Sequence, residues 1–178
     1  TVGMPPVAEK LGHMAAQAAM VEGLVYGMES GGGMYNGYYV PDRNLMYTAQ
    51  VLTQELYPQF ITAMRELAGG GLIMLPSSAE DFANPELAGY INATQKSAIG
   101  SSEEKVKFMK LAWDSIGSEF ASRHTQYEMF YAGAQFVTRG HALRTYDWDR
   151  SAKLVDSILD KYSLEDVIGD AAPKIAAE

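Results

Sequence analysis

The sequence has no cysteine, and this absence excludes a disulfide scaffold and any thiolate metal site within its 178 residues. Positive charge is also scarce, with 14 Lys and Arg against 22 Asp and Glu. Binding to nucleic acid or to an anionic membrane surface needs clustered Lys and Arg, so we expect neither partner. No apolar run approaches the roughly 20 residues of a membrane-spanning helix. A chain without cysteine fits a cytoplasmic location.

Short catalytic and nucleotide-binding motifs are missing as well. The sequence has no GxGxxG after a strand pattern, no P-loop, no HExxH and no GxSxG. Its three histidines, His13, His124 and His141, lie far apart along the chain, so we expect no metal site. The adjacent acids Glu103 and Glu104 stand at an expected helix start, where capping explains them better than acid–base catalysis.

Helical periodicity dominates the first part of the chain. Apolar residues recur at spacings of three and four, which predicts one long helix over residues 7–29 that the glycines at 31–33 end. A second long helix is expected from Asp42, a good N-cap, to Gly69. Pro58 lies inside this second helix and should kink or split it, because proline removes a backbone hydrogen bond.

The second half of the chain gives further helical patterns. One apolar face over residues 101–133 predicts a single helix that Gly133 ends. Its last turns carry His124 and Tyr127, which either face a polar pocket or an interface, or are satisfied by local hydrogen bonds. The other expected elements are a turn-rich loop at 34–41, helices at 85–95, 136–146 and 148–162, and a weakly ordered tail at 163–178. The sequence thus predicts an all-α, up-down helical bundle, a single domain with its core at residues 5–162.

The run Gly69-Gly70-Gly71 is the most informative local feature. Inside a helix each glycine costs about 1 kcal/mol relative to alanine, so the run should end one element and bring bare backbone close to a neighbour. That neighbour is either a phosphate group or another helix. The residues alone leave both alternatives open.

Several longer runs occur in an order that resembles one protein family. They are VAEKLG at 7–12, YVPD at 39–42, LYP at 56–58, GGGLIMLPS at 69–77, LAWD at 111–114, GSEFASR at 117–123 and YEMFYAG at 127–133. Together they resemble the C-terminal helical domain of the 4-hydroxyphenylacetate 3-hydroxylase family, the large component of two-component flavin-dependent phenol and chlorophenol monooxygenases. The resemblance extends over residues 5–162.

This resemblance implies a fold like that of acyl-CoA dehydrogenases, with this chain as the C-terminal four-helix domain that also assembles a tetramer. The chain is then expected to be a C-terminal fragment of a longer protein, and inactive by itself. In such enzymes FAD arrives as FADH2 from a separate flavin reductase, forms a C4a-hydroperoxide with oxygen, and hydroxylates a phenolic small molecule. The family's substrate-binding residues lie mainly in the N-terminal part, so no catalytic residue is assigned in this sequence.

The resemblance also implies two segments that contact FAD. In the wider fold a glycine-rich turn after a long helix approaches the FAD of a neighbouring subunit, and Gly69, Gly70 and Gly71 occupy that place. The second segment follows Gly133, where family members usually have Asp-Pro and then a helix whose start contacts the flavin. The corresponding residues are Ala134, Gln135, Phe136 and Val137, with Arg139 one turn further on. Because the Asp-Pro pair is absent, a backbone contact is expected from the helix start, with added charge from Arg139.

Two alternatives stay open. A lyase relative, 4-hydroxybutyryl-CoA dehydratase, shares the fold and binds FAD, but it needs an iron–sulfur cluster held by Cys and His, and this sequence supplies no cysteine. The other alternative is a non-catalytic helical module that only oligomerises. It predicts no affinity for flavin.

Overall fold

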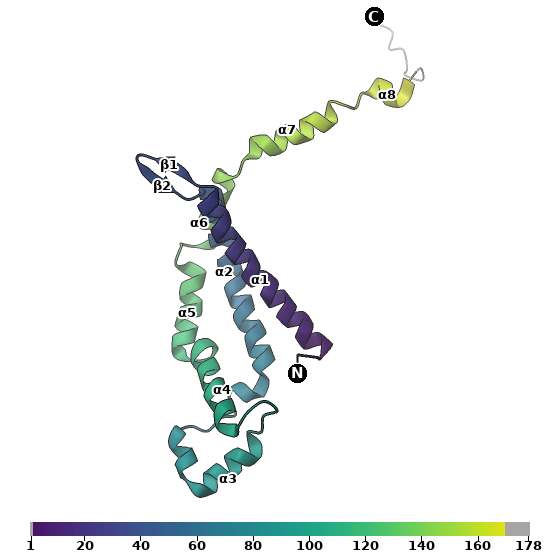
Figure 1. Ribbon diagram of the computed structural model, residues 1–178. Coiled ribbons are helices and arrows are strands. Elements are labelled where there is room, and N and C mark those ends of the chain that lie inside the picture. The colour runs from purple at the N-terminus through teal and green to yellow at the C-terminus, as the bar shows by residue number, and fades with distance from the viewer. Residues whose placement is uncertain (1, 170–178) are drawn as a thin grey trace, which may run out of the picture.

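The structure is a computed structural model that describes residues 2–169, and it confirms the predicted all-α class (Figure 1). Within these residues the only sheet is a two-stranded antiparallel hairpin. The elements in chain order are α1 (Pro5–Ser30), β1 (Gly33–Tyr35), β2 (Tyr38–Val40), α2 (Arg43–Ala68), the 3₁₀ helices η1 (Gly69–Leu72) and η2 (Ala79–Ala83), α3 (Pro85–Thr94), α4 (Ser102–Ile116), α5 (Glu119–Phe130), α6 (Gln135–Thr145), α7 (Trp148–Leu159) and α8 (Leu164–Ile168).

Local sequence signals set most of the helix starts. The side chain of Asp42 accepts a hydrogen bond from the Leu45 amide at 2.8 Å and caps α2. The Asn84 side chain caps α3 in the same way, and Pro85 follows as its first residue. Ser101 forms a reciprocal capping box at the start of α4. These helices therefore begin within two residues of the predicted positions.

The expected loop at 34–41 is instead the hairpin of β1 and β2. Tyr35 pairs with Tyr38 across its turn. The two turn residues, Asn36 and Gly37, have φ angles of 49° and 83°, as a tight hairpin turn requires. The three tyrosines at 35, 38 and 39 are exposed, so the hairpin adds little to the core.

Helix α2 is the centre of the molecule. It packs against α1 on one side and against α5 and α6 on the other. The predicted split at Pro58 is wrong, because α2 continues without a break from Arg43 to Ala68. The alternative, a kink at Pro58, stays a prediction. Proline removes only one backbone hydrogen bond, and we attribute the continuity to the neighbouring helices that pack along α2.

The predicted single helix at 101–133 is also wrong, since the chain breaks between α4 and α5 at Gly117 and Ser118. A Cβ on Gly117 would overlap the ring of Trp113, so the close approach of this ring requires glycine. The Ser118 hydroxyl accepts from the Ala121 amide at 3.1 Å and starts the new helix. Beyond the break, Phe120, which periodicity assigned to the apolar face, is 72% exposed.

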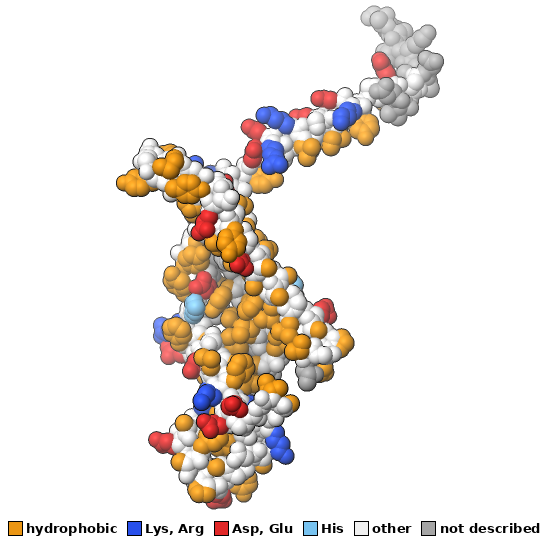
Figure 2. Space-filling model, viewed as in Figure 1, with side chains coloured by type: hydrophobic (Ala, Val, Ile, Leu, Met, Phe, Trp, Pro, Cys, Tyr) orange, Lys and Arg blue, Asp and Glu red, His pale blue; other side chains and the backbone are white. Residues whose placement is uncertain are grey.

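The buried core is small and lies where α2, η1 and α4 meet. It consists of Ile61, Leu72 and Ile116, with Tyr57 and Met64 among the side chains packed against it. Many large apolar side chains that periodicity assigned to a core are on the surface, and Figure 2 shows apolar side chains spread along the bundle. Helix α7 leaves the bundle altogether and projects away from it (Figure 1). Of the tail expected at 163–178, residues 170–178 lie outside the described residues.

Candidate flavin-binding surface

The glycine run lies at the lower end of α2 and forms η1. Gly69 ends α2 with φ 56°, a left-handed conformation that favours glycine, and its amide donates to the Arg65 carbonyl. A Cβ on Gly71 would lie 3.0 Å from the terminal carbon of Met109 on α4, so this glycine serves helix packing. Gly69 and Gly70 are exposed. A Cβ on Gly69 would have no atom within 4 Å, and a Cβ on Gly70 would have only the Met74 sulfur, at 3.9 Å. Within the run, Gly69 and Gly70 therefore present the most accessible backbone.

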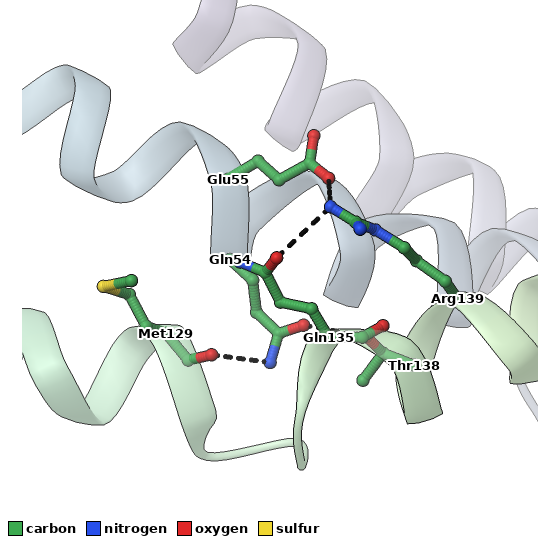
Figure 3. A network of polar contacts seen from close by, with 6 residues as sticks. All are labelled: Gln54, Glu55, Met129, Gln135, Thr138 and Arg139. Carbon is green, nitrogen blue, oxygen red and sulfur yellow. Dashed lines mark hydrogen bonds and ion pairs between the residues drawn. The ribbon is translucent and has the colours of Figure 1, made fainter.

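The second predicted segment is held against the middle of α2 by a buried amide (Figure 3). The side-chain nitrogen of Gln54 donates to the carbonyl oxygens of Met129 at 3.0 Å and Gly133 at 2.9 Å. Its side-chain oxygen accepts from the Thr138 hydroxyl at 2.9 Å. Gln54 is 1% exposed and Thr138 is fully buried. These bonds fix the turn from α5 to α6, and with it the position of the α6 start.

The start of α6 leaves backbone amides available. Its N-cap, Ala134, has no side chain that could accept a hydrogen bond. Within residues 2–169 no acceptor is found for the amides of Gln135 and Phe136, whereas that of Val137 donates to the Ala134 carbonyl. The Phe136 ring is 78% exposed beside them. Free amides at a helix start, where the helix dipole is positive, suit an anionic group.

Arg139 is already paired. Its guanidinium donates to the Glu55 carboxylate on α2 at 2.6 Å and to the side-chain oxygen of Gln135 at 3.2 Å (Figure 3). This arrangement braces α6 against α2 and neutralises much of the charge that Arg139 was expected to offer a phosphate. The side chain is nevertheless 54% exposed.

The structure does not bring the two segments together. Gln54 marks the level of the α6 start on α2, and Gly69 lies 15 residues further along the same helix, which at 1.5 Å per residue is about 22 Å. A single diphosphate cannot contact both Gly69 and the start of α6. The two segments are therefore separate surfaces within one chain.

Sequence reasoning missed a pocket between α1, α2 and α5. It has a volume of about 330 Å³, and its lining is mostly apolar. At its polar edge the Tyr57 hydroxyl lies 3.4 Å from Nδ1 of His124, and Nε2 of His124 lies 2.9 Å from the Glu128 carboxylate. Burial raises the pKa of the Tyr57 phenol, and the negative charge of Glu128 raises it further. His124 is thus hydrogen-bonded locally and also lines a pocket. Two of the alternatives expected for His124 from the sequence, local hydrogen bonds and a polar pocket, therefore hold.

Within the described residues, no group of three or more His, Cys, Asp and Glu is arranged to hold a metal ion. No helix described in residues 2–169 is long and apolar enough to span a membrane.

Comparison with known proteins agrees with the resemblance seen in the sequence. Residues 1–160 match the family described as 4-hydroxyphenylacetate 3-hydroxylase C terminal. The chain is 36% identical over 132 residues to the oxygenase component of 4-hydroxyphenylacetate 3-monooxygenase from Escherichia coli, an alignment that covers 71% of this chain and 25% of that protein. This chain therefore spans about a quarter of the length of that relative.

Solved structures share the fold. The oxygenase component of 4-hydroxyphenylacetate 3-monooxygenase, solved with FAD and 4-hydroxyphenylacetate, superposes with a TM-score of 0.83 at 25% identity, covering 89% of this chain and 33% of that one. An archaeal 4-hydroxybutyryl-CoA dehydratase from N. maritimus gives a TM-score of 0.78 at 16% identity, covering 90% and 32%, which is a likeness of fold alone. Because the family match extends over most of the sequence, this chain belongs to the 4-hydroxyphenylacetate 3-hydroxylase family and corresponds to its C-terminal region.

Proposed function

We propose that this chain is the FAD-binding and subunit-contact domain of a phenol hydroxylase that uses reduced FAD. The family match over residues 1–160 carries the proposal. Reduced FAD, delivered by a separate flavin reductase, would activate dioxygen so that one oxygen atom is transferred to the ring of a phenolic substrate. The residues of this chain would bind and orient the cofactor, while the groups that contact the phenol lie in other parts of the protein.

The residues present fit the phosphate-bearing part of FAD. The free amides of Gln135 and Phe136 supply two donors at the positive end of α6, and the exposed ring of Phe136 adds an apolar contact. Gly69 and Gly70 allow a ligand to approach the backbone, since they carry no side chain. Charge from Arg139 is a smaller contribution than expected, because Glu55 already binds it.

The separation of the two segments favours a homo-oligomer. They lie about 22 Å apart along α2, too far for one diphosphate to contact both. The resemblance implies that such a glycine-rich turn approaches the FAD of a neighbouring subunit, so we assign Gly69 and Gly70 to a neighbour's cofactor and the start of α6 to that of its own subunit. This arrangement agrees with a tetramer. The absence of cysteine fits a reducing compartment, and the cytoplasm is our proposed location.

The alternatives are less well supported. In superpositions with solved structures, the dehydratase is 16% identical to this chain and the hydroxylase component 25%. A purely structural module predicts no affinity for FAD, which a binding measurement tests.

The proposal is tested on the full-length protein that contains this chain. It is supplied with reduced FAD, isotopically labelled dioxygen and 4-hydroxyphenylacetate, and the product is analysed by mass spectrometry. We expect a hydroxylated phenol that carries one labelled oxygen atom. Binding of reduced FAD without any labelled product from this phenol or a panel of substituted phenols would contradict the hydroxylase function.

The FAD contact is tested separately with a pair of glycine variants. A Cβ at Gly70 has only the Met74 sulfur within reach, at 3.9 Å, so Gly70→Ala should fold normally and yet hold a ligand away from the backbone. We expect its affinity for FAD to fall about tenfold. Gly89→Ala, at an open position on α3, is the control and should bind FAD normally. Equal affinities in the two variants would remove the glycine run from the site.

A further inference from the structure

The pocket between α1, α2 and α5 has the size and the lining of a site for one small ring. Its volume is about 330 Å³. A cavity of about 150 Å³ in another protein already holds a benzene molecule. Apolar side chains form most of the wall, with Val21 on α1 and Leu56 and Phe60 on α2. The wall therefore favours an apolar body, and one substituted benzene ring fits the volume.

The polar edge of the pocket is a chain of three hydrogen-bonding groups. Nε2 of His124 lies 2.9 Å from the Glu128 carboxylate, which can only accept, so this nitrogen carries the hydrogen. Nδ1 of the neutral imidazole is then an acceptor, and the Tyr57 hydroxyl, 3.4 Å away, donates to it. The chain thus runs in one direction, from Tyr57 through His124 to Glu128.

This direction leaves the Tyr57 oxygen able to accept a further hydrogen bond. A phenolic oxygen both donates and accepts, and among residues 2–169 no donor to the Tyr57 oxygen is found. Burial and the charge of Glu128 raise the pKa of Tyr57, so this residue keeps its proton and the direction of the chain is preserved. A matching ligand therefore carries a donor, such as a hydroxyl group, on its apolar body.

The charge of the lining limits what else the ligand can carry. Among the described residues that line the pocket there is no Lys or Arg, and Glu128 is an acid. A carboxylate or phosphate inside the pocket would lie near Glu128 without a cation to balance it. The buried end of the ligand must therefore be neutral, and an anionic substituent has to point to the mouth of the pocket.

The pocket adjoins the candidate flavin-binding surface. Tyr57 follows Gln54 by three residues on α2, which is about 4.5 Å along the helix axis. Glu128 directly precedes Met129, whose carbonyl accepts from the Gln54 amide at 3.0 Å. The side chain that fixes the α6 start thus lies beside the pocket, and a ring in the pocket would be close to a flavin at that start.

We propose that this pocket binds the ring of a small phenol, whose hydroxyl group donates to the Tyr57 oxygen. The choice of a phenol rests on the proposed function, and the pocket adds residues of this chain to the phenol contacts that lie in other parts of the protein. Tyr57 is then a binding residue. His124 and Glu128 are positioning residues, because they hold the Tyr57 hydroxyl in the orientation that leaves its oxygen ready to accept.

Photolabelling of the full-length protein that contains this chain locates the site without any turnover. The probe is 4-azidophenol, whose azide links to nearby residues under light, and the labelled peptides are identified by mass spectrometry. We expect labels within residues 17–21, 53–60 or 124–128. Excess phenol should protect these segments about fivefold better than toluene, which lacks the hydroxyl group. Labels found only elsewhere, or no label because another part of the protein fills the pocket, would overturn the proposal.

Two pairs of variants test the pocket and its oxygen. Tyr57→Phe removes the accepting oxygen and should abolish the advantage of phenol over toluene, whereas Tyr38→Phe, at an exposed position, should retain it. Ala18→Trp should fill the pocket and prevent labelling, whereas Ala19→Trp, on the same helix but outside the lining, should not. An unchanged preference for phenol in Tyr57→Phe, or equal labelling in the two tryptophan variants, would contradict the assignment.

The positioning role is tested at Glu128. Glu128→Gln still accepts from Nε2 of His124 and should keep the preference for phenol, whereas Glu128→Leu frees the imidazole to turn and should lose it. The same preference in both variants would remove the positioning role.

The labelling result is independent of the hydroxylation result. Labels in the pocket without an oxygenated product would support the phenol site and overturn the hydroxylase function. An oxygenated product with labels only outside the pocket would overturn the phenol site alone.

Discussion

Gln54 on α2 and Thr138 on α6 are the largest fully buried side chains of the described structure, and they are hydrogen-bonded to each other at 2.9 Å. Both are polar, in a molecule whose apolar core is small. The Gln54 amide also binds the two carbonyls that frame the α5–α6 turn. A buried polar group with all its partners specifies one geometry, because any other arrangement leaves donors or acceptors unpaired. We infer that this pair sets the position of the α6 start, and therefore of its free amides.

Removing this amide should destabilise the protein. Gln54→Ala leaves the Met129 and Gly133 carbonyls without their donor and opens a cavity on α2, for which we expect a loss of about 2 to 4 kcal/mol in the free energy of unfolding. Chemical denaturation followed by circular dichroism measures it. Gln59→Ala, at an exposed position of the same helix, is the control and should change stability by less than about 0.5 kcal/mol. Similar losses in both variants would show that the network contributes nothing specific.

The break between α4 and α5 depends on Gly117. In Gly117→Ala the new methyl group overlaps the Trp113 ring, which must move, and we expect a loss of about 1 to 3 kcal/mol with a changed tryptophan fluorescence. Gly89→Ala has open space around its Cβ inside α3 and should instead stabilise by about 0.5 to 1 kcal/mol. If Gly117→Ala were as stable as the parent, the close ring contact would not constrain the break.

A capping residue at the start of α6 should stabilise the protein, because the present N-cap, Ala134, makes no side-chain hydrogen bond. Ala134 has the extended backbone of an N-cap residue, with φ −61° and ψ 146°, but no acceptor in its side chain. Ala134→Asp should therefore raise the free energy of unfolding by about 1 kcal/mol, because the carboxylate accepts from the free amides near the helix start. Thermal denaturation provides the measurement, with Ala134→Leu as a control that cannot cap. No gain over the leucine variant would mean that these amides are already satisfied.

Tyr57 should ionise later than the exposed tyrosines. Burial raises the pKa of its phenol above the ordinary value, and the charge of Glu128 adds to the rise, so the folded state favours the neutral form. The stability that Tyr57 contributes is then complete below the pKa of the unfolded chain and is lost as the pH rises through the higher folded pKa. Alkaline titration followed by ultraviolet absorbance should show a late phase that Tyr57→Phe abolishes. Tyr38→Phe, at a position 76% exposed, should leave that phase intact.

The sequence by itself determined the helical class, the starts of most helices and the family. Caps such as Asp42 and Asn84 act within one turn of backbone, so their effect can be predicted without knowing the rest of the fold. The family resemblance likewise needed only short runs in a fixed order. The two FAD segments were named from that resemblance, and their contact with flavin stays a prediction.

Only the tertiary structure decided how these parts relate in space. Gln54 lies off the apolar stripe of α2 and pairs with a residue 84 positions away, so no local pattern could reveal its burial. Helix α2 continues through Pro58 with other helices packed along it, and the ring of Trp113 lies so close to Gly117, at the break between α4 and α5, that a Cβ there would overlap it. Periodicity revealed neither contact. The distance between Gly69 and the α6 start, and the uncovered apolar side of α7, follow in the same way from packing between elements. Periodicity marks which side of a helix is apolar, whereas long-range packing decides whether this chain buries that side or leaves it for a partner.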